Sequence, residues 1–160
     1  MIRRVERADL PECVSVIRKS FQTVADEFGF TEENAPRFVA FATTEERLIW
    51  HMDGEHRLMY VDEEDGTICG YYSLAIRGNG ECELGSLSVL PRYRHRGIGG
   101  ELLRHSMETA REQNCSVMNL SIVEENTVLR RWYELHGAIH TGTEKFDFFP
   151  FTCGYMKIRL

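Results

Sequence analysis

The sequence contains no long apolar run and no excess of positive charge. No stretch of its 160 residues approaches the roughly 18 apolar residues of a membrane-spanning helix. Nineteen basic against 25 acidic residues give a net charge of −6, which argues against bulk electrostatic binding of nucleic acid. The N-terminal MIRRVERADL lacks the apolar segment of a signal peptide. We therefore expect a cytoplasmic protein with neither nucleic acid nor membrane as a partner.

Cysteine and histidine patterns for metal binding are also missing. The cysteines at positions 13, 69, 82, 115 and 153 are widely spaced, and none forms the CxxC pair of a zinc ribbon or thioredoxin-type site. No pair among the six histidines has a convincing metal-ligand spacing. We expect reduced thiols and no metal.

The composition is that of an ordinary globular protein. Apolar residues make up 42% and charged residues 28% of the chain. There are no linkers, repeats or low-complexity tracts, so residues 1–160 are predicted to form one domain. The order of predicted elements is β-α-α-β-β-β-α-β-α-β-β, a mixed α/β fold.

Helix signals dominate the N-terminal part of the chain. A short strand over residues 1–5 precedes a helix that runs to about Glu27, with Asp9 as its N-cap and Glu12 completing a capping box. Residues 28–55 are harder to interpret. We expect one helix that begins near Glu32 or Asn34 and a second short helix within residues 43–52.

Strands and helices alternate in the remainder. An acidic turn ending at Gly66 separates two strands within residues 56–76, and a third strand covers residues 81–90. A helix over residues 97–113 follows, with Ile98, Leu102, Ser106 and Ala110 on one stripe, and then a strand over residues 116–122. Asn126 is predicted to cap a helix that ends at Gly137, and two last strands enclose the turn FDFFPF at residues 146–151.

The segment from Val89 to Gly100 carries the clearest functional signal. A strand ends, residues 92–96 supply three arginines and a histidine, and three glycines open a helix. Uncovered backbone amides at a helix N-terminus bind anions, so the turn favours a pyrophosphate. The P-loop sequence Gly-Lys-Ser/Thr is absent, and Leu102 stands where a dinucleotide fingerprint needs glycine. A plain strand-to-helix turn with solvated arginines is the alternative.

This segment resembles the acetyl-coenzyme A motif of the GNAT N-acetyltransferase superfamily, through Arg94-x-x-Gly97-x-Gly99 after a strand ending in Val89-Leu90-Pro91. The resemblance implies a mostly antiparallel central sheet flanked by helices, with one strand splayed from its neighbour. It also implies that acetyl-coenzyme A lies in that gap. The residues thereby expected to bind it are Leu87, Ser88 and Val89 along the strand and Arg94, His95, Arg96, Gly97, Ile98, Gly99 and Gly100 in the turn.

A second segment, residues 125–138, strengthens the resemblance. It is similar to the family's Asn-capped helix with an aromatic–Tyr pair followed by Gly-Ala, here Trp132-Tyr133 and Gly137-Ala138. The resemblance places Tyr133 near the coenzyme sulfur, where it would protonate the leaving thiolate, and lets Asn126 touch the cofactor as well as cap its helix. A tyrosine that merely packs in the core is the alternative.

Glu83 is the candidate base that accepts the proton of the attacking amine. It lies six residues before Val89 on the same strand, so we expect both side chains on one face. Family members carry a carboxylate at this position. A strand glutamate that pairs with an arginine is the competing interpretation, and Glu81 is a weaker candidate. The resemblance assigns oxyanion stabilisation to a backbone N–H near Val89 or Leu90.

The acceptor is not specified by the sequence. A small-molecule or peptide amine is expected, and the aromatic turn with its single carboxylate, Asp147, could border an amine that has an apolar part. Two alternatives remain beside the enzyme. One is a non-catalytic module that senses coenzyme A or a metabolite, and the other is an interaction protein whose last strands form a homodimer, which is compatible with catalysis.

Overall fold

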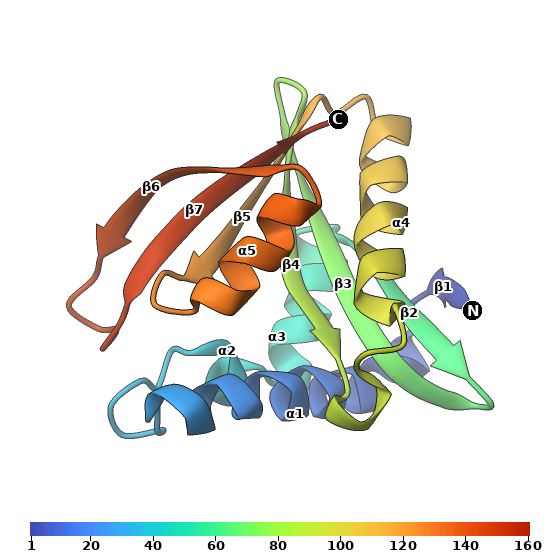
Figure 1. The fold of residues 1–160 in the computed structure, drawn as a ribbon. Coiled ribbons are helices and arrows are strands. Elements are labelled where there is room, and N and C mark those ends of the chain that lie inside the picture. Colours follow the sequence, from blue (N-terminus) through green and yellow to red (C-terminus); the bar gives the residue numbers. More distant parts are fainter.

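A seven-stranded sheet forms the centre of the computed structural model, which describes residues 1–160 (Figure 1). The strand order is β1-β2-β3-β4-β5-β7-β6, and every neighbouring pair is antiparallel except β4 and β5. This confirms the mixed, mostly antiparallel α/β fold. The strands are β1 (Ile2–Arg4), β2 (Leu58–Glu64), β3 (Thr67–Gly78), β4 (Glu81–Val89), β5 (Val117–Val123), β6 (Ala138–Lys145) and β7 (Thr152–Arg159).

Helices cover both faces of the sheet. One face packs on α4 (Ile98–Glu112) and α5 (Thr127–Leu135), and the other on α1 (Leu10–Phe28) and α3 (Glu45–Ile49). The stripe predicted for α4, namely Ile98, Leu102, Ser106 and Ala110, is entirely buried. The remaining helical segments are short: α2 (Val39–Ala42), the π-helical turn η2 (Trp50–Gly54) and the 3-10 turns η1 (Arg7–Asp9) and η3 (Pro91–Tyr93).

The start of α1 differs from the prediction. Asp9 occupies the N-cap position, but its side chain makes no capping bond to the helix. Its carboxylate instead accepts hydrogen bonds from the Arg3 guanidinium and from the Glu6 backbone N–H. Glu12 reaches across to accept a hydrogen bond from the Ile68 N–H at 3.1 Å. Asp9 and Glu12 therefore tie the helix to the strands rather than form the predicted capping box with each other.

The helix predicted to begin near Glu32 or Asn34 is absent. Asn34 instead closes a turn with Thr31, each side chain accepting a hydrogen bond from the backbone N–H of the other residue. The next helix, α2, begins at Val39 and has four residues. The helix predicted within residues 43–52 is confirmed as α3, capped by the Thr44 hydroxyl, and continues into η2.

A bulge interrupts β4. Tyr71 of β3 lies opposite Ser88, but Ser73 lies opposite Gly85, so β4 carries one extra residue between these pairs. Ser86 absorbs it with a φ of +52°. Cys82 and Leu84 before the bulge face the core beneath α4, and so do Leu87 and Val89 after it. The alternation of side chains therefore reverses within one strand.

The two parallel strands separate after a short common stretch. β4 pairs with β5 only through Glu81, Cys82 and Glu83, although both strands continue further (Figure 1). The splay implied by the resemblance is therefore present. The edge of β4 from residue 84 to residue 89 has no strand beside it on this side, which leaves backbone groups free for another partner.

A cluster of aromatic side chains covers the end of the sheet that carries the β6–β7 turn. Phe30, Phe38 and Phe151 are buried together in a small cluster that joins the segment after α1 to the β6–β7 turn. Their ring centroids lie 4.8–5.7 Å apart. All five cysteines are free thiols. None of the helices is both long and apolar enough to span a membrane.

Candidate active site

The glycine-rich turn presents bare backbone at the N-terminus of α4. Gly97 is its N-cap with a φ of +81°, and His95 adopts +62°. A Cβ built on Gly99 would lie 3.6 Å from Trp132 and 3.7 Å from Val89, and one on Gly100 would lie 3.5 Å from His136. The first residues of α4 therefore lie close to β4 and α5, next to the gap between the separated strands.

The basic residues of this turn have different surroundings. Arg94 reaches helix α1, where its guanidinium donates to the Thr23 hydroxyl at 3.0 Å and to the Ser20 carbonyl at 2.9 Å. Arg92 and Arg96 are exposed, and both guanidinium groups lie about 5 Å from the Tyr93 ring centroid. The Arg94 side chain thus anchors the turn to α1, while Arg92 and Arg96 remain accessible to an anion.

Helix α5 lines the opposite side of the gap. Asn126 caps it as predicted, and its side-chain oxygen accepts a hydrogen bond from the Leu129 N–H at 3.2 Å. Tyr133 is buried in the core cluster beneath α4, and burial raises the pKa of its phenol above the ordinary value. A protonated hydroxyl is the form that can donate a proton to a thiolate.

One backbone amide of β4 points into the gap. The Leu90 N–H donates to the Cys69 carbonyl at 2.8 Å, so it is already engaged by β3. Antiparallel pairs alternate between hydrogen-bonded and non-bonded positions, and the neighbouring pair is Val89 with Gly70. The Val89 N–H therefore faces away from β3. Of the two amides considered for an oxyanion, the one at Val89 is free.

Glu83 lies on the other face of the sheet from Val89. The expectation that both share a face is wrong, because the bulge at Ser86 reverses the alternation between them. The Glu83 carboxylate accepts a hydrogen bond from the Arg77 guanidinium at 2.9 Å, and both side chains are about half exposed. The competing interpretation, a strand glutamate that pairs with an arginine, is therefore present in this structure, although the sequence did not identify Arg77 as the partner.

The sequence also gave no sign of a polar group near Glu83. His51 and Arg57 lie on the same face, and burial lowers the pKa of His51 to about 4, with the Arg57 charge adding to the effect. His51 is therefore neutral at pH 7. His51 comes from the π-helical turn η2 and Arg57 from the residue just before β2, and only the tertiary fold brings them to the edge of this site.

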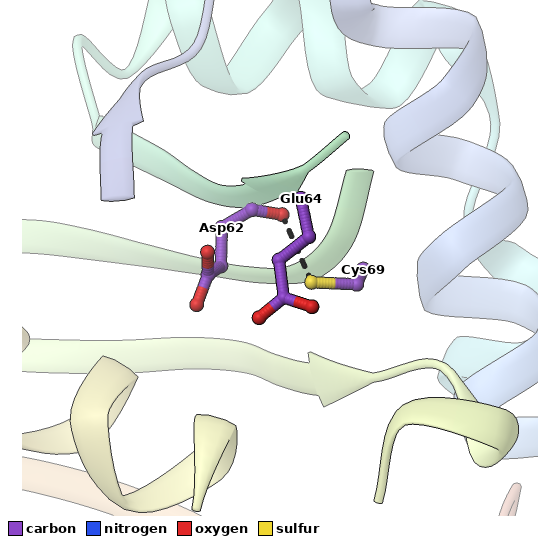
Figure 2. A group of neighbouring side chains, drawn as sticks. All are labelled: Asp62, Glu64 and Cys69. Carbon is purple, nitrogen blue, oxygen red and sulfur yellow. Dashed lines mark hydrogen bonds between the residues drawn. The ribbon is translucent and has the colours of Figure 1, made fainter. Parts of the chain in front are cut away.

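A separate group of possible metal ligands lies near the β2–β3 turn (Figure 2). Ligand atoms of Asp62, Glu64 and Cys69 lie within 4.8 Å of one another. The Asp62 carboxylate is already paired with the Met1 ammonium at 2.7 Å, and the Cys69 thiol donates to the Asp62 carbonyl. Burial raises the pKa of that thiol to about 11, which keeps it protonated. These contacts give Asp62 and Cys69 structural roles that need no metal ion.

Comparisons with known proteins agree with this geometry. The profile of the GNAT acetyltransferase family matches residues 22–138. An uncharacterized N-acetyltransferase of Lactobacillus delbrueckii subsp. lactis is 29% identical over 147 residues, which cover 85% of this chain and 82% of the relative.

Two solved structures share the fold. The PaiA N-acetyltransferase from Thermoplasma acidophilum, crystallised with coenzyme A, has a TM-score of 0.86 and 21% identity over 100% of this chain and 98% of that chain. The ribosomal-protein-alanine N-acetyltransferase from Brucella melitensis has a TM-score of 0.76 and 22% identity over 100% of this chain and 99% of that one.

The fold and the match together define an acyltransferase. The chain belongs to the GNAT acetyltransferase family, as the two sequence segments indicated. The enzyme class predicted from the sequence, an acetyl-coenzyme A-dependent N-acetyltransferase, is confirmed at the level of this family.

Proposed function

We propose that the protein transfers the acetyl group of acetyl-coenzyme A to a primary amine of a small-molecule or peptide acceptor, by direct attack within a ternary complex. The observation that carries this proposal is the unpaired edge of β4 over residues 84–89, which lies between Glu83 and the glycine-opened helix. Acetyl-coenzyme A would supply a thioester to this edge, and its pyrophosphate fits the bare amides of residues 95–100.

We assign each chemical step to a residue near the gap between β4 and β5. Glu83 would accept the proton of the amine, which must be neutral to attack. The Val89 N–H would stabilise the developing negative charge on the carbonyl oxygen. Tyr133 would protonate the leaving thiolate, and its raised pKa keeps that proton available. Asn126 would support the cofactor arm at the start of α5. No covalent enzyme intermediate is needed.

In the protein without substrate, Glu83 forms an ion pair with Arg77. This pair has to open before Glu83 can accept a proton from the amine. The Arg77 guanidinium occupies one oxygen of the carboxylate that the amine would contact. Exposed ion pairs of this kind contribute about 0–1 kcal/mol, so an incoming amine can displace it readily. Arg77 therefore shields the carboxylate only until the acceptor binds.

The decisive experiment compares Glu83→Gln with Glu81→Gln, and uses Glu108→Gln on the exposed side of α4 as control. Thiol release is measured with acetyl-coenzyme A and a panel of amines. We expect kcat/KM to fall at least roughly 100-fold for Glu83→Gln alone, with an unchanged thermal shift on adding acetyl-coenzyme A. A full rate in Glu83→Gln would refute its role as base. Binding of acetyl-coenzyme A without transfer to any amine would favour the sensing module.

A further inference from the structure

Only three buried polar side-chain atoms in the protein lack a hydrogen-bond partner. They are Nδ1 of His51, Nε of Arg57 and the hydroxyl of Tyr71. All three belong to the face of the sheet that carries Glu83. Arg57 is close enough to His51 for its charge to help burial lower the pKa of that ring, whereas burial raises the pKa of Tyr71. These three atoms are buried from solvent, so the part of the group that a ligand can reach is the remainder of the Arg57 guanidinium.

The Arg57 guanidinium is held over β4 with donors to spare. A single nitrogen, Nη2, contacts both oxygens of Glu55, at 3.2 and 3.3 Å. Nη1 points at Gly85, where a Cβ would come within 3.1 Å of it and within 2.9 Å of the Ser73 hydroxyl. The absence of a side chain at Gly85 therefore makes room for the guanidinium. Nη1 has no partner within the chain and is left to bind an acceptor group, whereas Nε is buried.

Gly85 and Glu83 place this guanidinium at a defined distance from the base. They are two residues apart before the bulge, so they share a face and are separated by about 7 Å along the strand. A short molecule with an amine at one end and an anionic group beside it could contact the Glu83 carboxylate and the Arg57 guanidinium together, with a hydrogen bond of about 3 Å at each end.

The charges around this face distinguish between classes of amine. Arg57 and Arg77 are balanced by Glu55 and Glu83. Lys157 adds a further positive charge, because it lies opposite Asn119, which in turn lies opposite Glu83. A polyamine would bring several positive charges and no group for Arg57 to bind. A zwitterion brings no net charge, and its carboxylate meets the arginine side.

We propose that Arg57 is a specificity-determining residue that binds a carboxylate of the acceptor, so that the acceptor is an amine that also carries a carboxylate, as an α-amino acid does. This inference rests on the proposed acetyl transfer. The ammonium or amine end lies at Glu83, from which it displaces Arg77. The carboxylate end lies over Gly85, where it takes the free donors of Arg57.

The test uses matched pairs of acceptors in the thiol-release assay. The twenty α-amino acids are compared with their decarboxylated amines, such as phenylalanine with phenethylamine and lysine with cadaverine. For wild type we expect at least one amino acid to exceed its decarboxylated partner in kcat/KM by roughly 10- to 100-fold. Arg57→Gln should remove that preference, mainly through KM, and leave the rate with the decarboxylated amine within about threefold.

Three further variants separate recognition from folding. Arg57→Lys keeps the charge but loses the planar fork, so it should restore only part of the preference. Gly85→Ala should displace the guanidinium and lower the preference without any change at residue 57. Arg111→Gln, on the exposed end of α4, is the control and should behave as wild type. The thermal midpoint of each unliganded variant reports folding separately.

The outcomes that overturn this proposal differ from those that overturn acetyl transfer. Decarboxylated amines that react as well as the amino acids, or a preference that survives Arg57→Gln, would show that the unfilled donors hold only water. Turnover of no amino acid by a protein that acetylates other amines would also refute it. Failure to bind acetyl-coenzyme A, by contrast, would refute the proposed function itself.

Discussion

Gly99→Ala should stabilise the protein and weaken its binding of acetyl-coenzyme A at the same time. Gly99 is not among the glycines with positive φ, and its new Cβ would meet Trp132 and Val89 at ordinary contact distances of 3.6 and 3.7 Å. Alanine is favoured over glycine in a helix by about 0.5–1 kcal/mol. For a domain of this size the unliganded thermal midpoint should rise by roughly 1–4 °C.

The same methyl group projects into the space between β4 and α5. With wild type, acetyl-coenzyme A at about 100 times its Kd should stabilise the fold by about 2.7 kcal/mol, or roughly 5–11 °C. If the methyl group weakens binding tenfold, the same concentration gives about 1.4 kcal/mol, half the shift. Differential scanning fluorimetry with and without the ligand measures both effects in one series.

Gly97→Ala is the matched control for this prediction. No atom lies within 4 Å of its added Cβ, but its φ of +81° makes alanine strained there. The strain should therefore cost about 1–2 kcal/mol of stability, and the unliganded thermal midpoint should fall. The reasoning about residue 99 is refuted if Gly99→Ala lowers the unliganded midpoint, or if it raises the midpoint and keeps the full ligand-induced shift.

Three more predictions concern the core and the titrating groups. Tyr133→Phe should keep its midpoint while kcat falls roughly 10- to 100-fold; since burial raises the phenol pKa, the rate ratio to wild type should stay flat between about pH 6 and 9. The folded-state pKa of His51, about 4 against 6.5, means that the folded protein resists protonation, so stability should fall as pH drops from 6.5 to 4. His51→Gln should flatten that part of the urea-denaturation profile. Leu102→Ala, on the buried side of α4 against Gly70, should cost about 2–5 kcal/mol in the same assay.

The regular elements were predictable because their local signals are strong. The buried stripe of α4 and the asparagine cap of α5 follow from spacing alone, and the structure confirms both. The segment between α1 and β2 was not predictable in detail. Its helices α2 and α3 have four and five residues, too few for a period to show, and burial of Phe38 and Leu48 fixes them instead.

The site was predictable as a set of motifs but not as a geometry. The glycines and Asn126 are recognisable in the chain, since their backbone roles are local. Glu83 could be named, but its face could not, because the bulge falls on Ser86, a residue type that gives no warning of a positive φ. The contacts of Arg57 with Gly85 and of Arg77 with Glu83 depend on how the strands are aligned, which only the folded sheet defines.

The bulge in β4 has a consequence for how two substrates could meet. Because the strand reverses its alternation at Ser86, it offers Glu83 and Gly85 to one side of the sheet and Leu87 and Val89 to the other. On the proposed assignment, donor and acceptor would approach from opposite sides, and the acetyl group would pass through the plane of the sheet at the gap. The acetyl donor and the acceptor would then enter and leave by separate routes, so one could be exchanged while the other stays bound.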